Sequence, residues 1–137
     1  MQVVIDSNIL IFANNATMPE QKESLAIIEE MIASDNTFYV NTIIISETYH
    51  ILTRMLGKEE AMQRTQAILS SKYITYLPVS YEIMNKAICT SCDKEVRIND
   101  AIIGIQALCN ADGILTDNTK DFKKIDGLNI IPLRKTE

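Results

Sequence analysis

The sequence is poor in the residues on which several common protein classes depend. Its three cysteines, Cys89, Cys92 and Cys109, are odd in number and too few for a disulfide framework. It has one histidine, no G-x-S-x-G turn and no plausible Cys–His arrangement, so no dedicated nucleophile is indicated. Basic residues are outnumbered, 13 against 18 acidic ones, for a net charge of −5. This excludes a non-specific nucleic-acid coat, which needs clustered Lys and Arg.

Long apolar runs are also absent. No stretch approaches the roughly 20 apolar residues that cross a bilayer, and no basic segment precedes the apolar N-terminus as it would in a signal peptide. We therefore expect no membrane association and a reducing, cytoplasmic environment. The length of 137 residues suits one domain, residues 1–137. Apolar residues at 47% and charged residues at 23% are ordinary globular values, which argue against disorder.

Strand-like and helical patterns alternate along the chain. Short β-rich apolar segments predict strands at residues 2–5, 38–40, 73–79, 113–116 and 129–131. Apolar residues at helical spacing predict helices at residues 20–34, 42–56, 58–70, 81–88 and 100–111. Asn41 or Thr42, Ser80 and Asn99 are expected to cap helices, and Pro78 favours an edge or terminal position. This alternation predicts an α/β fold of three layers, α/β/α, around a central, mainly parallel sheet.

Four acidic residues stand where a strand is expected to end or on a helix close to its start. Asp6 and Asp117 follow apolar runs, Glu47 lies in the second turn of a helix, and Asp100 opens another. Ligand sites of α/β sheets form at the carboxyl ends of the strands, so the four acids are expected to converge there. Such carboxylates are costly to bury without a cation, and Mg²⁺ and Mn²⁺ prefer oxygen ligands. The joint pattern indicates a divalent-metal site, whereas each acid alone is as well explained as a helix cap or a solvated charge.

The same acids lie in segments that resemble the four motifs of PIN-domain ribonucleases. The order and spacing match over nearly the whole chain, and the size resembles that of stand-alone, VapC-like toxins of toxin–antitoxin pairs. The resemblance implies a PIN-like fold and metal-dependent endoribonuclease activity on RNA phosphodiester bonds. The segments are Asp6-Ser7-Asn8-Ile9-Leu10, Ile45-Ser46-Glu47, Asn99-Asp100-Ala101-Ile102-Ile103 and Leu115-Thr116-Asp117-Asn118-Thr119-Lys120-Asp121-Phe122.

The resemblance implies roles for individual residues. Asp6 and Asp100 would be the principal ligands of Mg²⁺ or Mn²⁺. Glu47 would complete the acidic cluster or hold a water molecule. Asn8 would hydrogen-bond Asp6 and fix its rotamer, and Thr116 would line the pocket through its hydroxyl group.

The fourth acidic position departs from the strictest form of the motif. The site most often acidic there aligns with Asn118, with Asp117 beside it and Asp121 further along. We predict that Asp117 is the catalytic acid and Asn118 a neutral stand-in. Arg97 and Lys120 are predicted to attract RNA phosphates, although such charges often belong only to a solvated face.

Partners follow from the resemblance as well. It implies an RNA substrate, a homodimer and a small antitoxin that covers the metal pocket. Two alternatives stay open: a non-catalytic PIN-like scaffold that binds RNA or protein, and another Mg-dependent α/β phosphoryl hydrolase. A haloacid-dehalogenase-like phosphatase would have an aspartate where this chain has Asn8, and a receiver domain would have one after the third strand. Carboxylates that repel one another argue against a scaffold without a metal.

Overall fold

The computed structural model describes residues 1–133, so the last four residues of the predicted domain lie outside it. Within this range one five-stranded sheet has the order β3-β2-β1-β4-β5, and all neighbouring strands are parallel. This confirms the predicted central sheet. The edge position of β3 agrees with the nearby Pro78. The strands are β1 (Gln2–Ile5), β2 (Thr37–Val40), β3 (Ile74–Tyr76), β4 (Gly113–Thr116) and β5 (Ile130–Pro132).

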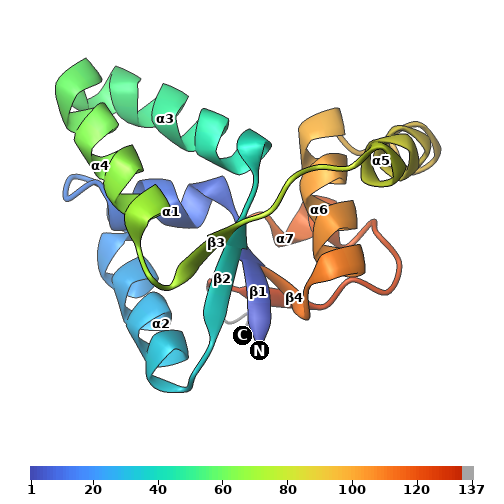
Figure 1. Ribbon diagram of the computed structural model, residues 1–137, viewed down its shortest axis with the longest axis horizontal. Helices are drawn as coiled ribbons and strands as arrows, with labels where there is room; N and C mark the ends of the chain where they lie inside the picture. The colour runs from blue at the N-terminus through green and yellow to red at the C-terminus, as the bar shows by residue number, and fades with distance from the viewer. Residues whose placement is uncertain (134–137) are drawn as a thin grey trace.

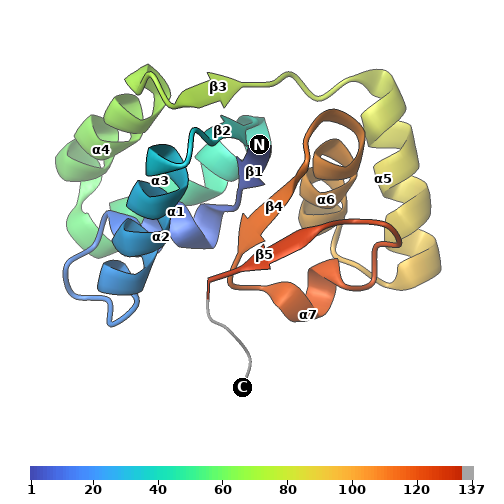
Figure 2. The same ribbon diagram turned by 90° about the horizontal axis from the view of Figure 1, so that it is seen from below.

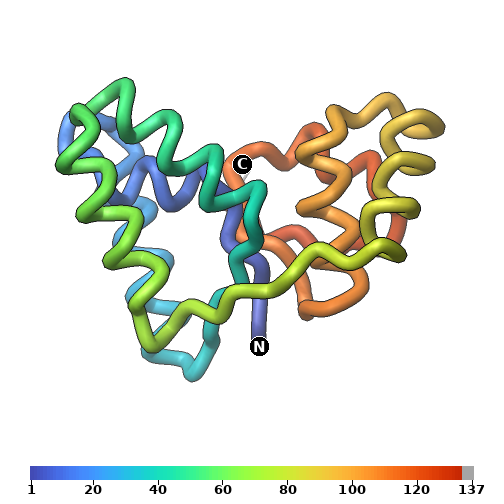
Figure 3. The backbone as a smooth tube through the Cα atoms, turned by 45° about the horizontal axis from the view of Figure 1, so that its top comes forward, coloured from blue at the N-terminus to red at the C-terminus, as the bar shows by residue number. Residues whose placement is uncertain are grey.

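Helices cover both faces of the sheet. Figures 1 and 2 show α1 to α4 on one side of it and α5 to α7 on the other, which confirms the three-layer α/β/α arrangement. The chain passes between the two sides along β3 and the segment that follows it (Figure 3). No helix within residues 1–133 combines the length and apolarity needed to cross a membrane. The helices are α1 (Ser7–Ala13), α2 (Gln21–Ala33), α3 (Thr42–Leu56), α4 (Lys58–Ser70), α5 (Tyr81–Lys94), α6 (Ile98–Asn110) and α7 (Thr119–Phe122).

Some helices differ from the sequence expectation. The pattern did not predict α1 or α7, because 7 and 4 residues are too few to show helical periodicity. Helix α5 continues to Lys94 instead of ending at Ile88. Helix α6 begins at Ile98 with Arg97 as its N-cap, so the prediction that Asn99 is the cap was wrong. This one-turn ambiguity is common at helix ends.

The hydrophobic core is centred on β1 and β4. Val3, Val4 and Ile5 of β1 and Ile114 and Leu115 of β4 are at most 2% exposed. Such continuous apolar burial is what a parallel sheet covered on both faces requires, because side chains of either face meet a helix. This burial holds the central strands in place, and it thereby also fixes the positions of the residues that directly follow β1 and β4.

A buried pair of amides joins the two sides of the molecule. Asn41, the N-cap of α3, donates through Nδ2 to Gln106 Oε1 of α6 at 2.7 Å. Gln106 Nε2 donates in turn to the Pro78 carbonyl oxygen at 2.9 Å. Both side chains are at most 1% exposed. Because α3 carries Glu47 and α6 carries Asp100, this bridge helps to set the relative position of two acids of the predicted site.

Replacing Gln106 by Leu should destabilise the protein. The change leaves the Asn41 amide and the Pro78 carbonyl without their buried partner, so we expect the free energy of unfolding to fall by about 1–3 kcal/mol. Urea unfolding followed by circular dichroism measures this. The matched control is Gln66→Leu on the exposed face of α4, which should change it by less than about 0.5 kcal/mol. Equal effects of the two substitutions would contradict the role given to the bridge.

Candidate functional site

The candidate site lies at the carboxyl edge of the sheet, where β1 and β4 end. The strand order changes direction there, since β1 has β2 on one side and β4 on the other; such switch points are where α/β sheets bind ligands. Asp6 directly follows β1 and caps α1, and its Oδ1 accepts a hydrogen bond from the Ser7 N–H at 2.8 Å. The hydroxyl of Thr116, the last residue of β4, donates to Asp6 Oδ2 at 2.7 Å. Both oxygens of this buried carboxylate are therefore held in place.

Two further acids reach this point from helices. Glu47 of α3 accepts a hydrogen bond from Ser7 Oγ at 3.2 Å. Asp100 lies in the first turn of α6 and is 5% exposed. Arg97 lies between the two acids, with Nε 3.4 Å from Asp100 Oδ2 and Nη2 3.8 Å from Glu47 Oε2. The fold thus brings Asp6, Glu47 and Asp100 to one place, from β1, α3 and α6.

Burial dominates the electrostatics of Asp6. It raises the pKa of this carboxyl to about 6 from an ordinary 3.8, because a charged carboxylate loses its hydration there. The hydrogen bonds from Thr116 and Ser7 lower the pKa, and the neighbouring charges of Asp100 and Glu47 raise it. A carboxyl group under these conditions favours any bound positive charge.

The structure distinguishes two candidates for the fourth acid. Burial raises the pKa of Asp100, the Arg97 guanidinium lowers it, and the charge of Asp121 on α7 raises it again. Asp121 therefore acts electrostatically on the cluster. Asp117, the acid predicted from the sequence, donates its backbone N–H to Asn8 Oδ1 at 3.3 Å and is partly buried. Its catalytic role stays a prediction.

Asn8, Thr116 and Asn118 form a hydrogen-bonded group behind Asp6. Thr116 Oγ1 accepts from Asn8 Nδ2 at 3.5 Å and from the Asn118 backbone N–H at 2.9 Å. With two donors directed at this oxygen, its own proton is free to point to Asp6. The predicted hydrogen bond from Asn8 to Asp6 is thus replaced by a relay through Thr116.

The sequence analysis had different success with three polar residues of this region: Ser7, Arg97 and Lys120. It missed Ser7, whose hydroxyl ties Glu47 to the start of α1; the available signal was its position directly after Asp6. Arg97 was predicted to meet substrate, but in this structure it contacts two acids. Lys120 is exposed on α7, as a residue that meets a substrate would be.

The oxygen donors of the site suit a hard divalent cation. Asp6 and Asp100 contribute buried carboxylates, and Mg²⁺ is usually held by only one or two protein carboxylates together with water. Within residues 1–133, no three His, Cys, Asp or Glu side chains are arranged to hold a metal ion. The fit therefore depends on the pair Asp6 and Asp100, while Arg97 supplies positive charge between Asp100 and Glu47.

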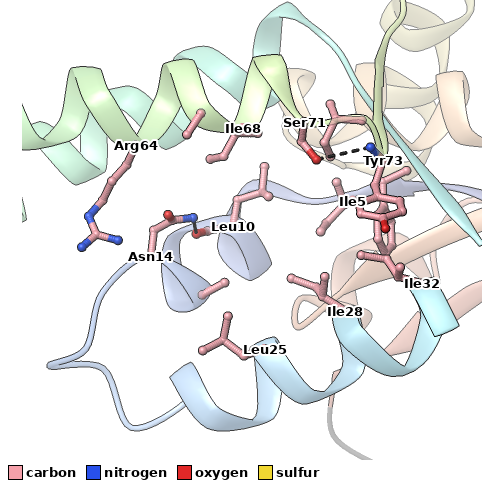
Figure 4. A pocket seen from close by; sticks show the side chains of 14 residues that line it. Ile5, Leu10, Asn14, Leu25, Ile28, Ile32, Arg64, Ile68, Ser71 and Tyr73 are labelled. Atoms are coloured by element: carbon pink, nitrogen blue, oxygen red, sulfur yellow. Dashed lines mark hydrogen bonds between the residues drawn. The ribbon is translucent and has the colours of Figure 1, made fainter.

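A separate apolar pocket opens on the α1, α2 and α4 side of the sheet (Figure 4). Its volume is about 290 Å³, and none of the acids of the site lines it. Helix α1 connects the two places, because Asp6 caps its N-terminus while Leu10 and Asn14 line the pocket. The other lining side chains include Leu25, Ile28, Ile32, Arg64, Ile68 and Tyr73.

Comparisons with known proteins show which proteins this chain and its fold resemble. The PIN domain family model matches residues 3–128. Ribonuclease VapC2 of Rickettsia felis is 24% identical over 131 residues, which are 93% of this chain and 95% of that protein. The solved structure of VapBC2 from Rickettsia felis, bound to a promoter DNA fragment, has a TM-score of 0.76 at 22% identity and covers 96% of this chain and 98% of its own. A toxin–antitoxin complex from Klebsiella pneumoniae has a TM-score of 0.70 at 22% identity, covering 98% and 99%.

Replacing Asp6 by a neutral residue should stabilise the folded protein at pH values where the Asp6 carboxyl is charged. Because its pKa is about 6 in the folded state and near 3.8 when unfolded, the folded protein binds more protons between these values, and stability falls as pH rises through them. We expect Asp6→Asn to raise the free energy of unfolding above pH 6.5 by about 1–3 kcal/mol, after the loss of one hydrogen bond. Urea unfolding in EDTA from pH 4 to 8 measures this.

The control for this substitution is Asp93→Asn, which neutralises an exposed acid and should leave the pH profile unchanged. A stability difference between Asp6→Asn and wild type that does not grow between pH 4 and pH 6.5 would show that Asp6 is not held in an unfavourable, charged form.

Proposed function

The chain belongs to the PIN-domain family, and on that premise we propose that it is a metal-dependent endoribonuclease and the toxin of a toxin–antitoxin pair. One observation carries the proposal. Asp6, Glu47 and Asp100 are scattered along the sequence and gather at the carboxyl edge of a parallel sheet. Their cost of burial gives the site a reason to bind a cation. A cation among carboxylates is what the hydrolysis of an anionic phosphodiester needs.

We assign Mg²⁺ or Mn²⁺ to Asp6 and Asp100. When bound, the cation would lower the pKa of a water molecule and neutralise charge on a phosphoryl oxygen. The protein contributes preorganisation: Thr116 and the Ser7 N–H hold the two oxygens of Asp6, so this carboxylate needs no rearrangement. Glu47, which accepts a hydrogen bond from the Ser7 hydroxyl, would orient a water molecule or accept its proton.

We further assign Arg97 and Lys120 to the RNA backbone. Both are exposed, the Arg97 side chain by 72%; Arg97 contacts two acids of the site from the start of α6, and Lys120 lies on α7, which follows Thr116 of the site closely in the chain. A cation beside the acids would offset the repulsion that phosphates meet from a chain of net charge −5. The RNA is expected to present an unpaired loop, because single-stranded segments expose a phosphodiester to a pocket of this kind.

Asp6→Asn or Asp100→Asn should abolish Mn²⁺-dependent cleavage of RNA, with a loss of at least about 100-fold. The folded state should survive, because each change removes a buried charge. Cleavage of a labelled RNA on a denaturing gel, with circular dichroism to verify folding, measures the result. Undiminished cleavage by either variant would contradict the assignment, and cleavage that persists in EDTA would contradict metal dependence.

A second pair of variants identifies the fourth acid. Asp121→Asn and Asp117→Asn make the same change four residues apart. We expect the larger loss for Asp121→Asn, because its charge acts on Asp100. A larger loss for Asp117→Asn would restore the acid that the sequence motif predicts. No loss in either would leave the three acids Asp6, Glu47 and Asp100 as the whole cluster.

We also propose that a small antitoxin protein binds this chain and that the apolar pocket of Figure 4 receives part of it. The pocket is open and apolar, and α1 links it to the acids, so one partner segment could contact both places. A homodimer is proposed on the family resemblance, and Tyr81 and Ile88 on α5, 81% and 53% exposed, provide an apolar surface for it. A cytoplasmic location stays a prediction.

Leu25→Glu should weaken antitoxin binding by at least about 10-fold, because a charge would be buried against the apolar partner. Leu25 lines the pocket and is 39% exposed, so the free protein should tolerate the change. Co-purification and calorimetry with the product of the neighbouring gene measure this. The control is Leu108→Glu, at a site 41% exposed and outside this pocket. Equal effects of the two substitutions would place the antitoxin elsewhere.

A further inference from the structure

Arg97 occupies an unusual place for an exposed side chain. Its guanidinium reaches Asp100 of α6 through Nε at 3.4 Å and Glu47 of α3 through Nη2 at 3.8 Å. These two acids come from helices on opposite sides of the sheet. Among the basic side chains of residues 1–133, Arg97 alone forms ion pairs with Asp100 and Glu47.

The two ion pairs that Arg97 forms with Asp100 and Glu47 are weak. Each ion pair uses one nitrogen and one oxygen, without the two parallel hydrogen bonds that make arginine–carboxylate pairs strong. The Arg97 side chain is 72% exposed, and exposed pairs contribute little to stability. Arg97 caps α6 with its backbone only, since its side chain makes no capping hydrogen bond. The side chain is therefore free to leave without disturbing the start of the helix.

The two carboxylates meet competing demands. Without a cation, Asp6, Glu47 and Asp100 repel one another, and that repulsion contributes to the raised pKa of Asp6. A single guanidinium reduces the repulsion, but a divalent ion carries twice the charge and would also bind the Asp100 carboxylate, which Arg97 contacts. Arg97 Nε lies on Asp100 Oδ2, an oxygen of one of the two proposed metal ligands, so a cation that takes this oxygen displaces the guanidinium from it.

We propose that Arg97 is a displaceable internal counter-ion: it pairs with Glu47 and Asp100 in the metal-free protein and competes with a divalent cation for Asp100. The competition lowers metal affinity and stabilises the acidic cluster while no metal is bound. Metal entry releases the guanidinium to the mouth of the site. This inference rests on the proposed function, because it requires that the acids bind a divalent cation.

The test is the dissociation constant for Mn²⁺, measured by calorimetry without RNA. Arg97→Gln removes the competitor, so we expect Mn²⁺ to bind about 3–10-fold more tightly than to wild type. Arg97→Lys keeps the positive charge, but on a single ammonium group that cannot span both acids. Its affinity for Mn²⁺ should therefore lie between those of wild type and Arg97→Gln. The control is Arg64→Gln, which removes an equal charge from an arginine that pairs with Glu60 at 2.9 Å and with neither Glu47 nor Asp100, and should change affinity less than about twofold.

A second measurement separates competition from a general charge effect. Arg97→Gln should lower the unfolding temperature in EDTA by about 2–4 °C, because the acids lose their counter-ion, and saturating Mn²⁺ should remove this difference. Unchanged or weaker Mn²⁺ binding by Arg97→Gln, or an effect matched by Arg64→Gln, would overturn the inference and leave the proposed function standing. A wild-type protein that binds no Mn²⁺ would overturn both.

Discussion

The parallel register between β1 and β4 is the constraint on which the site depends. Ile5 pairs with Leu115, and the N–H of Asp6 donates to the Leu115 carbonyl at 3.0 Å. This pairing brings the Asp6 carboxylate against the Thr116 hydroxyl. A slip of one residue would turn the side chains of β1 to the opposite face of the sheet, so the apolar core and the acidic site require the same register.

The site consists of negatively charged side chains in surroundings that disfavour their charge. The core holds Asp6 at 4% exposure and Asp100 at 5%, and Glu47 adds a third negative charge. Hydrogen bonds from Thr116 and the Ser7 N–H hold Asp6 but do not neutralise it. Stability given up in this way would be regained when a cation binds, which connects the burial of the acids with the metal-dependent hydrolysis that we propose.

The strand and helix pattern could be predicted because apolar periodicity is a local property. The sheet, the three layers and the long helices followed from it, and the motif residues singled out Asp6, Glu47 and Asp100. The short helices α1 and α7 were not predicted, because one or two helical turns are too short to show apolar periodicity. The hydrogen-bond relay was also missed in part, since whether Asn8 bonds to Asp6 or to Thr116 depends on the packing of side chains that lie far apart in the sequence.

By itself, the sequence determined which residue types stand at the ends of the strands, and with them the α/β class and the chemistry of oxygen ligands. Tertiary structure alone decided that Arg97 spans Glu47 and Asp100, that Asp121 acts on Asp100, and that the Asn41–Gln106 bridge joins α3 to α6. The physical reason is distance along the chain. Interactions between residues 21 to 65 positions apart, as these are, are set by how helices pack on the sheet, and no local pattern records that packing.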